Sequence, residues 1–249
     1  MVCQPELAII GGTGLDDLEG LEVLEKRAVM TPYGAPSSPL ITGKIAGKCV
    51  IFLPRHGARH TLPPHRINYR ANLYALYETG VKGVVAVNAV GGIHADMGPE
   101  HISIPDQIID YSYGRDHTYS DDEKSVLEHV DFTEPYDQQL RACLLGAARR
   151  LTISVSDGAT YACTQGPRLE TRAEIDRLER DGCDIVGMTG MPEAALAREL
   201  ALPYASIALT VNWAAGRSAE AITLASIMAT LQAGMMPVRA IIAQVIRQL

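Results

Sequence analysis

The chain has few aromatic residues and few cysteines for its size. Its 249 residues include one tryptophan, two phenylalanines and five cysteines. The cysteines are scattered, with no C-x-x-C pair, at Cys3, Cys49, Cys143, Cys163 and Cys183. This spacing argues against a zinc site or a thiol redox pair, and we expect no metal. It is typical of a reducing compartment, so a cytoplasmic location is expected.

Long apolar runs and an excess of positive charge are also missing. We find no apolar run near the length of a membrane span, and MVCQPELAIIGG lacks the basic and apolar regions of a signal peptide. We therefore expect no membrane association. The formal net charge of -7, without a basic stripe, argues against nucleic-acid binding. A small anion would need a local pocket of cations and backbone N–H groups.

Short apolar runs alternate with helical patterns along the whole sequence. Near-continuous apolar runs, typical of strands covered on both faces, lie at 6–12, 48–57, 81–92, 184–190 and 204–213. Helical patterns lie at 67–80, 171–182 and 192–200 and in the last segment from Val238. The alternation predicts a single α/β domain over residues 1–249. The acidic stretch at 120–137 is expected to form a surface loop.

Residues capable of chemistry follow each of the five predicted strands. They are Thr13, then Arg55 with His56, Asn88 with Ala89, Met188 with Thr189, and Asn212 with Trp213. Ligands of open α/β sheets bind beyond the carboxyl ends of the strands. We therefore expect these residues to meet in one crevice.

Two of these segments favour phosphate binding, although each also has a plainer structural interpretation. GGTGLDD (11–17) fails the dinucleotide pattern because Asp17 replaces the third glycine, yet its N–H groups and Thr13 could cradle a phosphate. The alternative is a tight turn. RHGARH (55–60) offers the forked donors of Arg55 and a further donor from His56, while His60 could only shape the pocket. The alternative is a solvated basic turn.

The later segments allow similar pairs of interpretations. Thr189 could hold an anion near a helix start or simply cap that helix. Met188 could contact a ligand or fill the core. Glu170 could accept a ring N–H or complement the positive end of a helix. No serine triad, zinc motif or P-loop is present in the sequence.

Several motifs together resemble the purine nucleoside phosphorylase and methylthioadenosine phosphorylase family. They are IIGGTGLDD, PRHGARH, INYRANLYAL, NAVGG, QGPRLET, GMTGMPEAALARE and YASIALTVN, and they span nearly the whole chain. The resemblance implies an α/β/α domain around a mixed sheet, usually assembled as a homotrimer or hexamer. It also implies reversible phosphorolysis of a purine nucleoside, with inorganic phosphate as co-substrate and no other cofactor.

The resemblance assigns roles to individual residues. It implies phosphate binding by Thr13, Arg55, His56, Asn88, Ala89 and Thr189. It places Met188 against the ribose and Asn212, Trp213 and Ala214 at the purine. By the same resemblance, His129 reaches the substrate of a neighbouring subunit.

Two departures within the family indicate the substrate. Methylthioadenosine phosphorylases resembling this chain carry aspartates where it has Asn212 and Ala214, and they lack a carboxylate at Glu170. Enzymes acting on inosine and guanosine resemble it at Asn212 and Glu170. An ionised Glu170 can accept from N1–H of hypoxanthine, whereas adenine presents N1 without a proton. Asn212 and Glu170 would then also stabilise electron density arriving on the leaving purine, so both are candidate catalytic residues.

The second departure concerns the 5′ end of the sugar. Nucleoside phosphorylases resembling this chain place a histidine near the 5′-hydroxyl, but the segment EAITLASIMATL (220–231) has none. Leu224 and Ile227 would give an apolar wall suited to a methylthio group, although plain helix core is the alternative for both.

Together the departures predict cleavage of S-methyl-5′-thioinosine to hypoxanthine and 5-methylthioribose 1-phosphate. Methylthioadenosine or general 6-oxopurine nucleosides remain alternative substrates. A nucleosidase, a non-catalytic nucleoside sensor and a nicotinamide dehydrogenase are the rival functions.

Overall fold

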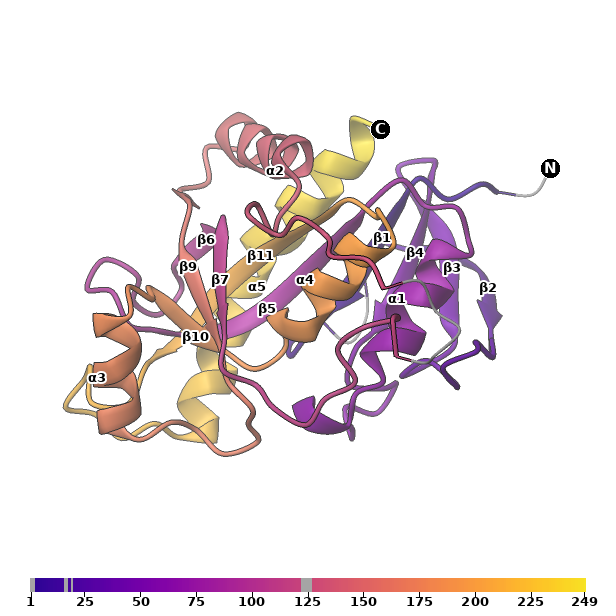
Figure 1. The fold of residues 1–249 in the computed structure, drawn as a ribbon. Coiled ribbons are helices and arrows are strands. Elements are labelled where there is room, and N and C mark those ends of the chain that lie inside the picture. The colour runs from indigo at the N-terminus through magenta and orange to yellow at the C-terminus, as the bar shows by residue number, and fades with distance from the viewer. Residues whose placement is uncertain (1–2, 16–17, 19, 122–126) are drawn as a thin grey trace.

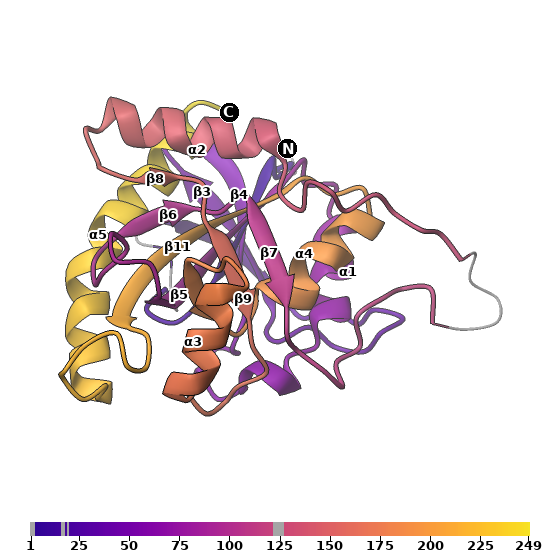
Figure 2. The ribbon, with the colours of Figure 1, turned by 60° about the vertical axis from the view of Figure 1, so that its left-hand side comes forward.

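The computed structural model describes residues 3–15, 18, 20–121 and 127–249. Asp16 and Asp17 of the first glycine loop and part of the acidic stretch lie outside these residues. Within them a mixed sheet stands between layers of helices (Figures 1 and 2). This arrangement confirms the predicted α/β/α fold class.

The centre of the sheet is the long strand β5 (Val84–Gly92). On one edge, β11 (Tyr204–Trp213) pairs in parallel with β5 from Val84 to Gly92. On the other edge, β1 (Leu7–Gly11) pairs in parallel with Val84–Ala86, while β10 (Ile185–Gly187) pairs antiparallel with Gly91 and Gly92. The carboxyl ends of β1 and β10 therefore point toward each other along one edge of β5.

Further strands extend the sheet on both sides. Beyond β1 come β4 (Lys48–Pro54), β3 (Leu40–Ile45) and the edge strand β2 (Glu22–Arg27). Beyond β10 come β9 (Thr160–Cys163) and β7 (Gln107–Asp110), while β6 (Ile102–Ile104) pairs with β11 and β8 (Ser156–Asp157). The sequence predicted β4 together with β1, β5, β10 and β11. It did not predict the other strands, which are short, as β6, β8 and β9 are, or partly or wholly exposed, as β2, β3 and β7 are.

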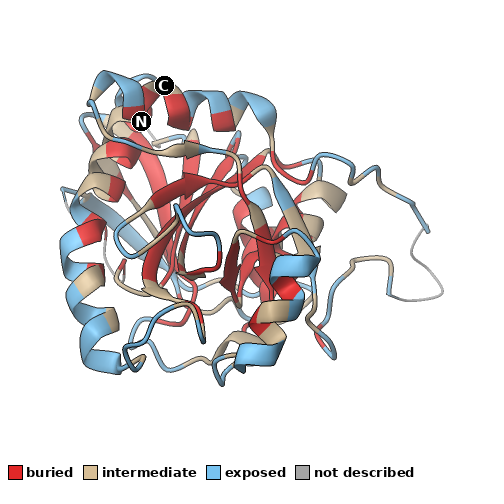
Figure 3. Cartoon of the chain, turned by 90° about the vertical axis from the view of Figure 1, so that its left-hand side faces the viewer, coloured by how far each residue is buried: buried red, intermediate tan, exposed pale blue. Residues whose placement is uncertain are grey.

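Helices bury both faces of the sheet. The alternating side chains of β1 show this directly. Leu7 and Ile9 join the core under α2 (Gln138–Arg150) and α5 (Leu224–Arg247). Ala8 and Ile10 point to the opposite face and join the core under α1 (Tyr69–Tyr77) and α4 (Gly190–Glu199). A smaller core lies between α3 (Arg172–Arg180), β9 and β10. Figure 3 shows the buried sheet surrounded by half-exposed helices. The one 3₁₀ turn in the described ranges is η1 (Pro64–Arg66).

The expected convergence of five strand ends needs a correction. Asn88 and Ala89 lie inside β5 rather than at its end, and β10 runs antiparallel to β5. The polar residue and glycines of NAVGG imitate a strand end, but β11 pairs with β5 through Gly92 and keeps it extended. Because β10 runs antiparallel to β5, Met188 and Thr189, which follow β10, lie beside the middle of β5.

The cysteines were also only partly understood from the sequence. Cys3 and Cys49 form a disulfide, which links the segment before β1 to β4, whereas Cys143, Cys163 and Cys183 are free. The two partners are 46 residues apart, so spacing alone gave no sign of the pair. The scattered cysteines predicted thiols typical of a reducing compartment, and the Cys3–Cys49 disulfide departs from that prediction.

Helix α5 contradicts the expectation that no segment is apolar and long enough for a membrane span. By length and composition its 24 residues pass that test. In the fold, however, Val238, Ile241, Ile242 and Val245 are buried in the core shared with α2 and the sheet. The apolar character of α5 is thus partly explained by this packing.

Two helical glycines allow a paired test of this packing. A Cβ on Gly234 of α5 would lie 2.7 Å from the Cδ1 atom of the fully buried Leu209, whereas a Cβ on Gly146 of α2 would meet nothing nearer than 3.8 Å. We expect Gly146→Ala to raise the free energy of unfolding by about 0.5–1 kcal/mol through helix propensity. Gly234→Ala should lower it by roughly 1–3 kcal/mol through overpacking. Urea unfolding at one protein concentration measures both, and an equal gain from both alanines would contradict this packing.

Candidate functional site

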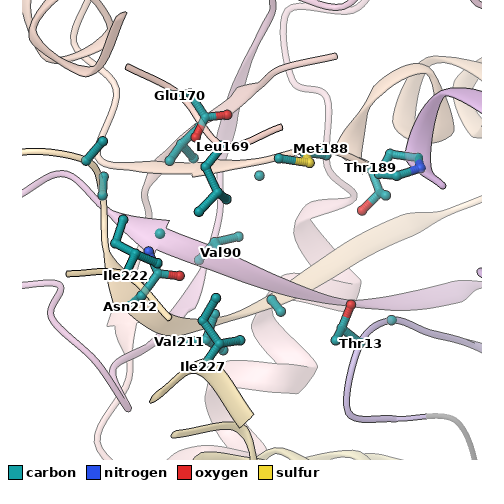
Figure 4. Close-up of a pocket in the computed structure, with 18 of the residues that line it drawn as sticks. Thr13, Val90, Leu169, Glu170, Met188, Thr189, Val211, Asn212, Ile222 and Ile227 are labelled. Carbon is teal, nitrogen blue, oxygen red and sulfur yellow. The ribbon is translucent and has the colours of Figure 1, made fainter. Parts of the chain in front are cut away.

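A pocket of about 200 Å³ opens where β1 and β10 meet along the edge of β5. Figure 4 shows Thr13 and Thr189 toward one end, Glu170 and Asn212 toward the other, and Met188 between them. The pocket is lined by ten of the predicted site residues: Thr13, Arg55, His56, Ala89, Glu170, Met188, Thr189, Asn212, Ala214 and Ile227. Asn88, Trp213 and Leu224 do not line it, and the reasons differ.

Asn88 lies beneath the pocket and acts on it through Thr189. The Ser206 hydroxyl donates to Asn88 Oδ1 over 2.7 Å, and Asn88 Nδ2 donates to Thr189 Oγ1 over 2.8 Å. Since Thr189 Oγ1 already accepts, its own proton is left to donate to a ligand in the pocket. Thr189 stands at the N-cap of α4 without a side-chain capping bond, so capping alone does not explain it.

Arg55 is held by two residues that lie far from it in the sequence. Its Nε and Nη2 donate to the two carboxylate oxygens of Glu193 over 2.7 and 2.8 Å, and Nη1 donates to the Val87 carbonyl over 3.0 Å. Burial opposes the charge on Arg55, but the Glu193 carboxylate outweighs this effect and raises the arginine pKa. The guanidinium is therefore a permanent cation at the pocket wall.

The glycine loop is shaped by this arginine. A Cβ on Gly12 would lie 2.4 Å from the Val87 carbonyl oxygen and 3.0 Å from Arg55 Nη1. Gly12 thus allows a close approach of backbone to backbone and to the guanidinium. Beside it, Thr13 Oγ1 lies 3.5 Å from His60 Nε2.

His56 presents its ring to the same end of the pocket. The ring Nδ1 lies 2.8 Å from the Leu62 carbonyl oxygen, which can only accept, so Nδ1 carries a proton. The His56 and His60 rings stack with centroids 4.6 Å apart. His60 is therefore a neighbour of the pocket that supports its lining residues.

At the opposite end, Glu170 is oriented by Thr164. The Thr164 hydroxyl donates to Glu170 Oε1 over 2.6 Å, which leaves Oε2 with its acceptor capacity. Helix α3 begins after Glu170, within the predicted helical segment 171–182, and takes its own capping box from Thr171 and Glu174. The carboxylate is therefore not needed to complete the helix start.

Asn212 lies beside a bulge in β11. The register against β5 shifts between Thr210 and Asn212, and bulges re-aim side chains locally. Asn212 Nδ2 donates to the Trp213 carbonyl over 2.7 Å, which fixes the amide plane. Trp213 itself packs over Gly98, where a Cβ would meet its ring at 2.6 Å, so the indole is turned away from the pocket.

The apolar wall is formed by a different pair from the one predicted. Ile222 and Ile227 line the pocket, whereas the Leu224 side chain is 75% exposed. Helix α5 begins only at Leu224, so Ile222 belongs to the preceding loop and helical spacing could not find it. The apolar character expected here is present, but Leu224 does not supply it.

Arg115 is a second buried arginine that the sequence analysis missed. Its Nη1 donates to the carbonyls of Met188 and Met191, its Nη2 to those of Thr164 and Gln165, and its Nε to Gln165 Oε1. These bonds connect the Met188 segment with the segment leading to Glu170. Arg115 therefore fixes the two ends of the pocket relative to each other.

Comparisons with known proteins agree with this geometry. The family described as the phosphorylase superfamily matches residues 6–247. A probable S-methyl-5′-thioinosine phosphorylase of Pseudomonas syringae pv. tomato is 55% identical over 239 residues, 96% of this chain and 97% of its own. The 6-oxopurine nucleoside phosphorylase of Pyrococcus furiosus is 45% identical over 233 residues, 92% of this chain and 87% of its own.

A solved structure shows the same fold. The methylthioadenosine phosphorylase of Schistosoma mansoni, in complex with adenine, superimposes with a TM-score of 0.93 at 31% identity. The match covers 98% of this chain and 91% of the other. Similarity therefore extends over the whole sheet and its helices.

Replacing Arg115 tests whether it ties the pocket together. Arg115→Lys should lower the free energy of unfolding by roughly 2–4 kcal/mol, because a lysine leaves several buried carbonyls without donors. Arg168→Lys is the matched control, since Arg168 is exposed and pairs with Glu174 at the surface; it should cost less than about 1 kcal/mol. Urea unfolding measures both, and equal losses would contradict the role of Arg115.

Proposed function

The chain belongs to the phosphorylase superfamily, and we propose that it cleaves S-methyl-5′-thioinosine with inorganic phosphate. The products are hypoxanthine and 5-methylthioribose 1-phosphate. The enzyme is a pentosyltransferase of the purine nucleoside phosphorylase type. The observation that carries the choice of base is the Glu170 carboxylate, held by Thr164 at the end of the pocket that also holds Asn212.

The base end suits a 6-oxopurine. Glu170 Oε1 is occupied by the Thr164 hydroxyl, so Oε2 is the oxygen that accepts N1–H of hypoxanthine. Asn212 uses one N–H on the Trp213 carbonyl and keeps a second N–H and its Oδ1 for the purine edge. Adenine would set its unprotonated N1 against the carboxylate, an unpaired polar contact that sites of this kind reject strongly.

The sugar end suits a methylthio group. Ile222 and Ile227 line the wall near the start of α5, and both are partly buried. A 5′-hydroxyl placed against these side chains would lose its hydrogen bonds with water. A sulfur-bound methyl group instead gains from leaving water. Leu224, which the sequence predicts for this wall, does not line the pocket.

The remaining end suits phosphate. Thr189 has a proton to donate, Thr13 adds a hydroxyl, and His56 lies beside them. The three bonds made by Arg55 leave two of its five N–H donors for a ligand. Ala89 contributes backbone at the wall, while Asn88 acts through Thr189. Such converging donors and one cation are what an oxyanion requires.

The mechanism follows from this division of the pocket. The glycosidic bond lengthens while positive charge develops on the ribose, and the phosphate held under the sugar stabilises that charge and then attacks C1′. Met188 packs against the ribose, and Ala214 borders the purine. Asn212 donates to the leaving base and stabilises the electron density that arrives there, while Glu170 holds the base in place through N1–H. Catalysis is therefore positioning and electrostatic stabilisation by preorganised groups.

We also propose that the enzyme works in the cytoplasm as a homotrimer. His129 is exposed and is absent from the lining of its own chain's pocket, which suits a contribution to a neighbouring copy. The exposed apolar side chains of Leu224 and Met228 lie on α5 beside Ile227, where a neighbour could cover them.

The substrate proposal is tested by initial rates with phosphate on methylthioinosine, methylthioadenosine, inosine and adenosine. We expect kcat/KM for methylthioinosine to exceed the others by at least about tenfold, because one mismatched polar or apolar contact costs more than 1.4 kcal/mol. Preference for methylthioadenosine would contradict the base argument, and preference for inosine would contradict the apolar wall. Base release without phosphate would indicate a nucleosidase, and binding without turnover a nucleoside sensor.

The role of Glu170 is tested by Glu170→Gln. The glutamine carbonyl can still accept from Thr164, so its NH₂ group replaces Oε2 and can donate to N1 of adenine. We expect the ratio of kcat/KM for methylthioinosine to that for methylthioadenosine to fall at least about tenfold. The KM for phosphate is the internal control, because Glu170 lies at the other end of the pocket. An unchanged ratio would remove Glu170 from base selection.

A further inference from the structure

The ion pair between Arg55 and Glu193 lies directly behind the proposed phosphate site. Both side chains are 0% exposed, and their residues are 138 positions apart in the sequence. Arg55 lines the pocket whereas Glu193, on α4, does not. The carboxylate therefore reaches the pocket only through the guanidinium.

Every oxygen of Glu193 has a defined partner. Oε2 accepts from Arg55 Nε over 2.7 Å, and Oε1 accepts from both Arg55 Nη2 and the Tyr204 hydroxyl, each over 2.8 Å. Burial and the adjacent Glu193 carboxylate raise the pKa of Tyr204, so its hydroxyl keeps the proton that it donates. The Glu193 carboxylate thus fixes the plane of the guanidinium. The Tyr204 hydroxyl, on β11, in turn fixes the carboxylate.

Fold stability alone gives little reason for such a pair. Two buried charges lose their hydration, and well-packed apolar residues of similar volume often serve a core as well or better. The surrounding core offers that option, since Ala194, Leu196 and Ala197 on the same helix pack with apolar strand residues. The position of the pair behind the pocket, rather than its stability, suggests its purpose.

We propose that Glu193 and Tyr204 are positioning residues that hold Arg55 in the orientation required to bind phosphate. The inference rests on the proposed function. Glu193 accepts from Nε and from one N–H of Nη2, and the Val87 carbonyl accepts from one N–H of Nη1. The two N–H groups that remain, one on Nη1 and one on Nη2, are therefore held in one fixed orientation. The cost of ordering a long arginine side chain is met during folding instead of during phosphate binding.

The test is the KM for phosphate of Glu193→Gln and Tyr204→Phe, measured with saturating nucleoside. A glutamine offers one acceptor oxygen and turns an NH₂ group toward the arginine, so we expect the phosphate KM to rise about tenfold or more, as loss of one charged hydrogen bond predicts. Tyr204→Phe, which removes only one hydroxyl, should raise it about threefold to tenfold. The KM for nucleoside should change less than about twofold in both variants, because both act on the phosphate end of the pocket and not on the end that holds the base.

Tyr136→Phe is the matched control. Tyr136 is also a buried tyrosine whose ring stacks on that of Tyr204 at 6.1 Å, but its hydroxyl has no hydrogen-bond partner in the described residues. Its removal should leave the phosphate KM unchanged. If Tyr136→Phe and Tyr204→Phe behave alike, or if the nucleoside and phosphate constants rise together, Glu193 and Tyr204 are merely structural and the proposal fails.

A fall in the phosphate KM of Glu193→Gln would mean that Glu193 acts as a competing anion, which overturns positioning. If Glu193→Gln does not fold, the comparison of Tyr204→Phe with Tyr136→Phe decides alone. Wild-type protein without phosphate-dependent base release would refute the proposed function itself, whereas normal wild-type rates with unchanged Tyr204→Phe would refute only this inference.

Discussion

The pocket depends on the sharing of one edge of β5 between two strands. Because β11 takes the opposite edge along the whole of β5, β1 and β10 must divide the remaining edge between them. They approach from opposite directions, so the loop after β1 and the loop after β10 face each other across Val87–Val90. Close approaches make this possible: a Cβ on Gly187 would lie 2.1 Å from the Tyr161 hydroxyl oxygen, and one on Gly92 would lie 2.0 Å from the Met97 carbonyl oxygen.

This arrangement also separates the chemistry of the pocket into two ends. Cationic and hydroxyl groups come from the loops after β1, β4 and β10, whereas the acceptor Glu170 comes from the segment before α3. The two ends are joined behind the pocket by Arg115, whose donors reach both segments. The spacing between them is thus set by a buried side chain rather than by a continuous strand.

The sequence predicted the parts of this structure that have local signals. Buried strands carry continuous apolar runs, and helices carry apolar residues at helical spacing, so elements of both kinds were found. Part of the pocket lining follows such strands, namely Thr13, Arg55, His56, Met188 and Thr189, whereas Ala89 lies within β5, Glu170 before α3 and Ile227 on α5. The individual roles of these residues stay predictions. Glu193 and Arg115 were missed because their partners are distant in the sequence: 138 residues separate Glu193 from Arg55, and 73 separate Arg115 from Met188. Thr164 and Tyr204 lie only 6 and 11 residues from Glu170 and Glu193, but no local pattern shows which partner a single hydroxyl takes. Leu224 was misplaced because it is the first residue of α5 and 75% exposed, although helical spacing groups it with Ile227. Ile222 precedes the helix, so helical spacing did not find it.

The hydrogen bonds from Ser206 through Asn88 to Thr189 have a direction, and this has an evolutionary consequence. Each group donates to the next, across 118 and then 101 residues of sequence. A substitution that reverses any one bond would turn the last hydroxyl from a donor into an acceptor, and compensation would require changes on β11, β5 and the loop after β10 together. Ser206, Asn88 and Thr189 are distant in the sequence, yet the direction of these bonds couples them, so a change at one position requires matching changes at the other two.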